Sequence, residues 1–380
     1  MQLVAYGAQD IYLTGNPQIT FFKVVYRRHT NFSMESIEQT WNGTHPGAGR
    51  CSATISRNGD LVHRMYLQLK LAKDSGTIAK HNPSAYGITS VEVEIGGQQI
   101  DKHSGQWMET WAELTQPNSA ATVADSALTN ATTSTPFQRM SGMGGVVKGS
   151  TNDGSFKFVP LQFWFCRNPG LALPLIALQY HEVKIIMVHD FTTAYFTILQ
   201  ELKLYADYIY LDTDERRRFA QVSHEYLIEQ VQEQISSAAK SVELTFNHPV
   251  KELIWTKNPW AAGALAAPDS GTYHLTLNGH DRFSARDYTY FTRTQVWEHH
   301  TGPGGLTSDT AGPGSFQDQI AVYSFALKPE EHQPSGTCNF SRIDNAQLVS
   351  SVGSTALTIY AINYNVLRIM SGMGGLAYSN

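Results

Sequence analysis

Two histidine–glutamate pairs have the residue types for metal or acid–base chemistry. The string "YHEVK" contains His181 and Glu182, and "SHEYL" contains His224 and Glu225. Neither string has the H-E-x-x-H spacing that places two imidazoles on one helical face around zinc. If these segments are strands, adjacent side chains point to opposite faces of the sheet. Both pairs are therefore predicted to be structural.

The other candidates for chemistry also lack the surroundings that their reactions need. His299 and His300 open a glycine-rich loop with no third ligand nearby in sequence, so we expect solvated loop histidines. The strings "GPGG", "GPG" and "SGMGG" lack the Lys-Ser/Thr and the strand-to-helix context of a phosphate-binding loop. No Ser, Cys or Asp lies in a nucleophile motif such as G-x-S-x-G. The sequence predicts no enzyme activity, no cofactor and no metal.

The densest charge run, "DYIYLDTDERRRFAQ", lies just past the midpoint of the chain. It holds four acidic residues and three arginines: Asp207, Asp212, Asp214, Glu215, Arg216, Arg217 and Arg218. Consecutive arginines can neutralise phosphates, but a stripe that binds nucleic acid should be net basic. Here the local sum is +3 − 4 = −1, and the whole chain carries −5. We therefore predict no direct nucleic-acid binding.

Length and composition indicate a soluble protein of two β-rich domains. The 380 residues exceed what one compact core usually holds. Hydrophobic residues make up 42% and charged residues 16%, and the 30 glycines and 15 prolines, spread along the chain, suit many turns.

Several features predict assembly inside a cell. The amino terminus lacks the basic and apolar regions of a secretory signal, and no segment reaches transmembrane length. Three widely spaced cysteines, Cys51, Cys166 and Cys338, fit reduced thiols better than disulfides. Without secretory entry, chance is favoured over glycosylation at the four Asn-x-Ser/Thr sequons, Asn31, Asn42, Asn130 and Asn339.

The dominant hydrophobic period is two, which is the period of strands with one buried face. It is clear in "MYLQLKL" (65–71), "SVEVEI" (90–95) and "SVELTF" (241–246). Helical spacing occurs in "GQWMETWAEL" (105–114) and in "EYLIEQVQEQI" (225–235), and the second could equally be a strand. Many short strands separated by turns predict a sandwich or barrel.

A faint internal repeat indicates that two similar β domains follow each other. Three segments recur in the same order: 58–66 with 247–255, 94–99 with 276–281, and 165–174 with 325–334. The offset between copies shrinks along the chain, so the first copy must carry longer loops. The stretch from Thr115 to Gly145 is predicted to be a long exposed loop, with His299–Asp318 as its shorter counterpart. The charge run then joins the two domains.

Four long segments carry a resemblance to a known family. They are "GAQDIYLTGNPQITFFKVVYRRHTNFSMESIEQTW" (7–41), "PLQFWFCRNPGLALPLIALQYHEVKI" (160–185), "DYIYLDTDERRRFAQVSHEYLIEQVQ" (207–232) and "YAINYNVLRIMSGMGGLAYSN" (360–380). Together they resemble the major capsid protein of large icosahedral nucleocytoplasmic DNA viruses. The resemblance covers both halves and both termini, but not the loops 115–156 and 297–318.

The resemblance implies an all-β chain of two tandem eight-stranded antiparallel jelly rolls. The implied parts are an N-terminal arm (1–23), a first jelly roll (24–206), a linker (207–218) and a second jelly roll (219–380). Homotrimers would form pseudo-hexagonal capsomers that tile an icosahedral virion shell assembled in the host cytoplasm. The arm would lie near minor capsid proteins and the internal membrane, and the loops at the outer ends of the barrels, Thr115–Gly145 and His299–Asp318, would form exposed towers.

Two questions stay open from the sequence. In the linker, bidentate pairs between arginines and carboxylates could fix the angle between the barrels, or the segment could be a solvated connection whose surface pairs contribute ~0–1 kcal/mol each. The rival functions are a virion scaffolding protein of the same fold and a carbohydrate-binding β-sandwich protein.

Overall fold

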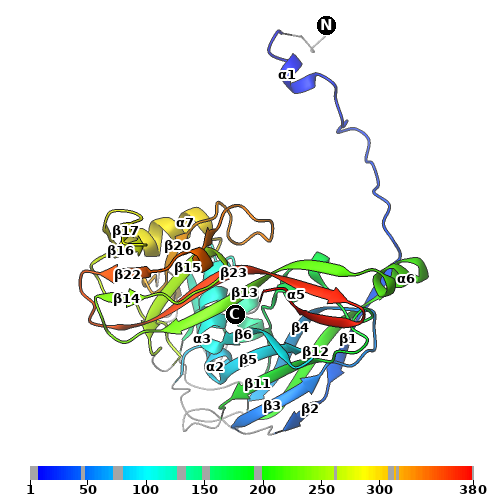
Figure 1. Cartoon of the computed structure of the whole chain (residues 1–380), viewed down its shortest axis with the longest axis horizontal. Helices are drawn as coiled ribbons and strands as arrows, with labels where there is room; N and C mark the ends of the chain where they lie inside the picture. Colours follow the sequence, from blue (N-terminus) through cyan, green and yellow to red (C-terminus); the bar gives the residue numbers. More distant parts are fainter. Residues whose placement is uncertain are drawn as a thin grey trace.

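The chain folds into two β-sandwich units that lie side by side, with an N-terminal arm that projects away from both (Figure 1). The computed structural model describes residues 7–43, 48–71, 80–125, 134–147, 155–191, 199–260, 263–306, 312–313 and 316–378. The statements below concern these residues.

Two five-stranded antiparallel sheets form the first unit. One has the order β1 (Phe32–Gln39), β12 (Leu199–Leu211), β4 (Leu61–Leu71) and β10 (Leu173–Pro174), with β9 (Phe156–Pro160) also paired to β4. The other has the order β2 (Trp41–Gly43), β3 (Gly49–Thr54), β11 (Val183–His189), β5 (Ile88–Ile95) and β6 (Gln98–Ser104). Met65, Leu67 and Leu69 of β4 are buried in the core between them, so the predicted alternation is confirmed.

The second unit repeats this plan with a six-stranded and a five-stranded sheet. The first has the order β13 (His224–Ile235), β23 (Ala356–Met370), β15 (Pro249–Asn258) and β20 (Ala321–Ser324), with β21 (Cys338–Asn339) on β15 and β24 (Met373–Leu376) on β23. The second has the order β14 (Ser241–Glu243), β22 (Ala346–Ser350), β16 (Thr272–Leu277) and β17 (His280–Asp281), with β18 (Arg286–Asp287) on β16. The ambiguous segment 225–235 is therefore a strand.

The strand pairing confirms the duplication. In each unit the first strand pairs with the last long strand, β12 or β23, which also pairs with β4 or β15, as in a jelly roll. The repeated segments 58–66 and 247–255 lead into β4 and β15, and 94–99 and 276–281 form equivalent hairpins. Because split and added strands bring the sheets to five and five, and to six and five, the count of eight strands per unit stays a prediction.

Helices are short, and the longest is α3 (Gly105–Thr115), which confirms the helical spacing of that segment. The Ser104 side chain caps it by accepting a hydrogen bond from the Trp107 amide at 3.2 Å. The others are α1 (Ile11–Thr14), α2 (Pro83–Tyr86), α4 (Pro136–Ser141), α5 (Trp164–Arg167), α6 (Thr213–Gln221), α7 (Gln295–His299), the 3-10 turns η1 (Pro169–Leu171) and η3 (Phe340–Arg342), and the π-helix η2 (Tyr290–Thr294).

The prediction of an exposed loop from Thr115 to Gly145 is wrong for the part that the structure describes. This part contains α4 and β7 (Thr122–Asp125), which pairs with β8 (Val146–Val147) and β19 (Gly312–Pro313). The buried Gln138 amide donates to the Thr122 and Gly144 carbonyls at 3.0 and 2.7 Å. Buried polar side chains order this region, and they leave no amphipathic period to find in the sequence.

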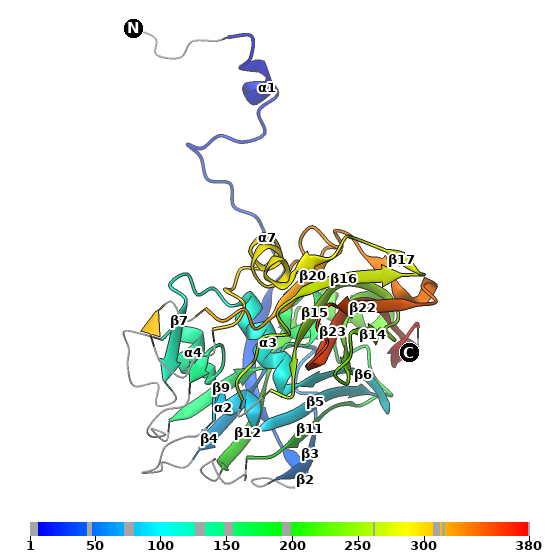
Figure 2. The same cartoon turned by 90° about the vertical axis from the view of Figure 1, so that its left-hand side faces the viewer.

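The arm is described from Gly7 onward. It contains α1 and then runs as exposed, extended chain to β1, away from the body in both views (Figures 1 and 2). Its exposed side chains include large apolar ones: Ile11, Tyr12, Leu13, Ile19, Phe21, Phe22, Val24, Val25 and Tyr26. Nothing in the single chain covers this apolar surface.

Candidate interdomain and assembly interface

Helix α3 forms an apolar joint between the two jelly rolls (Figure 1). It belongs to the first unit, and Trp107, Trp111 and Leu114 lie one turn apart on a single face. That face packs on the outer side of the second unit's six-stranded sheet, against Val231, Ile254, Val322, Tyr360 and Ile362. The Trp107 ring lies 5.0 Å from the Tyr360 ring and 5.4 Å from the Trp111 ring. The units therefore share a core, which holds them in one orientation.

Polar contacts from the same region fix the register of this joint. The Gln106 amide donates to the Thr256 hydroxyl at 2.9 Å, and the Val231 amide donates to the Asp101 carboxylate at 3.1 Å. All four groups are buried. Because unpaired buried polar groups cost about 1–3 kcal/mol each, a shift of one unit along the other would be unfavourable.

Two glutamates of α3 hold loops from both units. Glu109 accepts hydrogen bonds from the Gly144 and Gly145 amides at 3.0 Å, and Glu113 accepts one from the Leu306 amide of the second unit. Burial and the adjacent Glu113 carboxyl raise the pKa of Glu109 well above its usual range, although the glycine amides oppose this. Glu109 is thus expected to stay protonated under conditions in which an exposed glutamate is charged.

An ion-pair cluster crosses the joint beside α3. Arg167 of α5 lies 3.2 Å from Glu229 of β13, and the fully buried Lys251 lies 2.9 Å from the same carboxylate. Arg167 also stacks over the Trp111 ring at 5.1 Å. Burial opposes ionisation of Glu229, but Arg167, His332 and Lys251 outweigh it and lower its pKa to about 2. Arg167 of the first unit thereby helps to keep the buried Glu229 of the second unit ionised.

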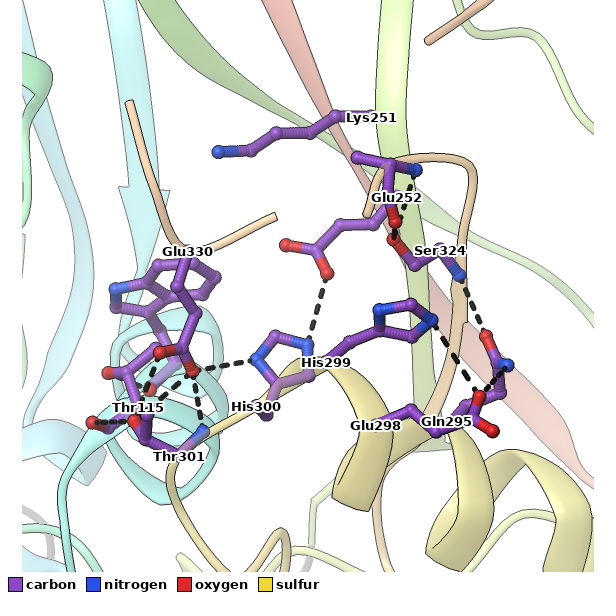
Figure 3. Close-up of polar contacts among 12 residues, drawn as sticks. Thr115, Lys251, Glu252, Gln295, Glu298, His299, His300, Thr301, Ser324 and Glu330 are labelled. Atoms are coloured by element: carbon purple, nitrogen blue, oxygen red, sulfur yellow. Dashed lines mark hydrogen bonds and ion pairs between the residues drawn. The ribbon is translucent and has the colours of Figure 1, made fainter. Parts of the chain in front are cut away.

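His300 is the centre of a second buried cluster (Figure 3). Its Nε2 lies 3.0 Å from Glu252 and its Nδ1 lies 3.0 Å from Glu330. Burial opposes its charged form, but the two carboxylates prevail and raise the pKa of His300 to about 9. Next to it, the Thr301 hydroxyl donates to the Thr115 carbonyl at the end of α3 at 2.9 Å.

The expectation that both loop histidines are solvated is wrong for His300, whose side chain is fully buried. His299 is half-buried and contacts the Leu327 carbonyl at 3.3 Å. The partners of His300 lie 48 and 30 residues away in sequence, so spacing could not find them. The available signal was the pair Lys251–Glu252 inside the apolar strand "VKELIW", since charges in such a strand need buried partners.

The charge run between the units is regular structure. Asp207 lies in β12, and Asp212 caps α6 by accepting from the Thr213 amide at 2.8 Å. Arg216 Nε lies 2.9 Å from the buried Asp60 of the first unit, whose other oxygen accepts from the Leu211 amide at 2.9 Å.

The rest of the run faces water. Asp214, Arg217 and Arg218 are exposed and Glu215 is half-buried, and within the described residues none of the four has an ion pair. One of the three arginines therefore contacts a carboxylate, through one nitrogen and not in the predicted bidentate pair, and the main contact between the units lies at α3.

The other positions considered from the sequence, the two His–Glu pairs and the sequon asparagines, do not form a common site in the described residues. The His181 ring accepts from or donates to Gly374 main-chain atoms, and His224 contacts the Phe219 carbonyl at 2.8 Å. Across the described ranges, no group of three His, Cys, Asp or Glu side chains could hold a metal ion. Asn31, Asn42 and Asn339 are exposed, and Asn130 lies outside the described residues.

Comparison with known families accounts for both units. The model "Major capsid protein N-terminus" matches residues 20–212, and "Large eukaryotic DNA virus major capsid protein" matches residues 215–375. The chain belongs to the major capsid proteins of large eukaryotic DNA viruses. The boundary between the two matches falls at the start of α6. No helix in the described part is long and apolar enough to cross a membrane.

Individual members of this family match the chain over almost their whole length. The chain is 54% identical to the major capsid protein of Pyramimonas orientalis virus and 40% identical to that of Paramecium bursaria Chlorella virus 1, covering 100% of this chain and 99% of each relative. Among solved structures, the PBCV-1 capsid superposes with a TM-score of 0.77 at 37% identity over 95% of this chain and 100% of that one. The Faustovirus major capsid protein shares the fold, with a TM-score of 0.69 at 14% identity over 96% of this chain and 94% of that one. The protein is thus a structural component of a virion capsid.

Proposed function

We propose that this capsid protein forms homotrimers, in which six jelly rolls give a pseudo-hexagonal capsomer, and that these capsomers tile an icosahedral shell. The observation that carries the proposal is the buried joint at α3, which holds two similar but non-identical barrels in one rigid chain. Three such chains can fill a position of nearly sixfold packing while each contact stays specific. The expected boundaries at residues 206 and 219 are corrected by the strands: β12 keeps the first jelly roll paired as far as Leu211, and α6 (Thr213–Gln221) connects it to the second.

The test is the solution mass of the purified protein together with its outline by electron microscopy. A trimer with a hexagonal outline supports the proposal, and a monomer that persists under assembly-like ionic conditions contradicts it. A scaffolding protein would be absent from purified virions, whereas a major capsid protein would dominate their protein gel. A carbohydrate-binding function would give specific signals on a glycan array.

We further propose that the arm contacts minor capsid proteins and the internal membrane, and that assembly takes place in the host cytoplasm. The exposed apolar side chains of the arm support the first statement, because isolated chains seldom leave such surface uncovered. The free, buried thiols of Cys51 and Cys166 agree with a reducing compartment. We propose no enzymatic activity, cofactor or direct contact with nucleic acid.

The Arg216–Asp60 pair is proposed to set the angle of α6 against the first jelly roll. Phe219 of α6 packs on the small apolar cluster of Leu61, Ala172 and Ile209, so charge and burial act at the same place. In this role Arg216 acts on the chain connection, and α3 sets the orientation of the barrels.

A further inference from the structure

No described segment of the chain covers the groove on the outer face of the first unit's sheet, which is formed by β4, β9 and β12. The groove has a volume of about 610 Å³, and its lining includes Arg64, Tyr66, Phe158 and Asp207. Tyr66 stacks on Tyr205 with ring centres 5.3 Å apart and meets the Phe158 ring edge-on at 6.1 Å. These aromatic rings are only half-buried.

The same positions in the second unit are fully covered. Tyr66 lies opposite Tyr205 and Pro160 on the outer face of its sheet, and Ile254 lies opposite Tyr360 and Val322 on the outer face of the corresponding sheet of the second unit. Those three residues of the second unit are fully buried, because Trp107 and Trp111 of α3 pack on them. The groove on the first unit is therefore the unoccupied equivalent of the surface that receives α3.

The second unit also carries an equivalent of α3. The helical stretch η2–α7 (290–299) follows β18, as α3 follows β6, and both precede the next strand of the same sheet pair, β20 and β9. On one side of this stretch, Phe291 is buried in the core of its own unit, and Val296 is buried in the cluster that the second unit shares with α3. On its other side Trp297 is 82% exposed, whereas every residue of α3 from Gly105 to Leu114 is buried.

We infer that the groove over Tyr66 and Phe158 is the docking site for Trp297 of a second copy of this chain. The contact would repeat between chains the joint that α3 makes within one chain, so this inference rests on the proposed trimer and names its interface. Figure 2 shows α7 at the top of the body, α3 below it, and β4 and β12 lower still. In a head-to-tail contact of this kind, one rotation relates the two barrels of a chain and another relates neighbouring barrels of two chains. The contact closes into a ring of six barrels when these two rotations are alike.

The chemistry of the two surfaces is complementary. Trp297 offers a large apolar ring to an aromatic-lined groove, and Glu298 beside it is exposed, as is Arg64 at the groove. Trp and Arg are the residue types most enriched at the centres of protein interfaces. The apolar arm of a neighbouring chain could occupy the same groove, and the experiment below distinguishes the arm from Trp297 as its occupant.

The experiment combines cross-linking with solution mass. One chain carries Trp297→Cys and a second, tagged chain carries Tyr66→Cys, and a short bismaleimide joins them, since two aromatic-sized side chains separate the backbones by more than the ~7 Å that a disulfide spans. We expect cross-links between the two kinds of chain, and only background links with either variant alone. Trp297→Asp should weaken trimer association by on the order of 30-fold or more, as hot-spot residues do. Tyr378→Asp is the matched control, because Tyr378 is also an exposed aromatic residue, at 62%, and it should leave the trimer intact.

The outcomes distinguish failure of the docking site from failure of the proposed trimer. A stable wild-type trimer that gives no cross-link between the positions, and that Trp297→Asp leaves intact, overturns the docking site but not the proposed trimer. A cross-link from Phe22→Cys to Tyr66→Cys in place of the one from Trp297 assigns the groove to the arm, and likewise overturns the docking site. A wild-type protein that is never trimeric overturns the proposed function itself.

Discussion

Replacing His300 should remove a pH-dependent part of the stability of the second jelly roll. The buried imidazole lies 3.0 Å from both Glu252 and Glu330, which raise its pKa from 6.5 to about 9. A difference of about 2.5 pKa units corresponds to about 3 kcal/mol of unfolding free energy. Because the folded pKa is the higher one, this contribution is fully present below pH 6.5 and is lost as the pH rises through 9.

The assay is urea unfolding of the wild type and of His300→Gln from pH 6 to pH 10. The variant is expected to be less stable at pH 6, with a gap that shrinks by about 3 kcal/mol between pH 6.5 and pH 9. Lost packing adds a constant to this gap, so the readout is its change with pH. His280→Gln serves as the control, because His280 is an exposed histidine of the same unit and should show no such change.

A gap between wild type and His300→Gln that stays constant from pH 6 to pH 10 would refute the reasoning, because it would mean that His300 is not charged by its two neighbours. Glu252→Gln gives a second check. It removes one of the two carboxylates that hold the proton, and so it lowers the folded pKa of His300. The loss of stability with rising pH, which begins near pH 6.5 in both proteins, should therefore be smaller in this variant and end at a lower pH than in the wild type.

Three further predictions concern the joint, the connection and the arm. Trp107→Ala should lower the unfolding free energy by about 3–5 kcal/mol, measured by denaturant unfolding, because it empties the shared core between the units. Arg216→Gln should destabilise the protein by up to about 1 kcal/mol, whereas Arg217→Gln should have no effect, and equal effects of the two variants would contradict the role of the pair with Asp60. Trypsin should cut the exposed arm after Arg28 in free trimers but not in shells, and equal cleavage in both states would show that the arm does not become ordered on assembly.

The strands and the duplication could be predicted from the sequence because they depend on local patterns. Burial of one face of a strand forces a period of two, as in residues 65–71, and a repeated strand order leaves paired segments such as 58–66 and 247–255. Helix α3 was predictable for the same reason, since its two tryptophans lie one turn apart.

The joint and its charges depend on contacts between distant parts of the chain. Nothing near Arg167 in the sequence indicates that it meets Glu229, and His300 has no carboxylate partner within its own loop. The stretch from Thr115 to Gly145 shows the same limit, because the hydrogen bonds of Gln138 order it without leaving a hydrophobic period. Patterns of burial are thus readable from the sequence, whereas pairing of buried polar groups requires the fold.

The α3 joint also changes the thermodynamics of building a ring of barrels. Six separate barrels would need six contacts between free bodies, and each association costs roughly 4–15 kcal/mol in lost translational and rotational freedom. Within this chain the contact at Trp107 and Trp111 forms during folding, between parts that are already tethered. A ring of three chains takes two associations where six separate barrels would take five, and it cannot contain an odd number of barrels. The covalent connection through α6 therefore lowers the entropic cost of assembly by more than any single interface residue could offset.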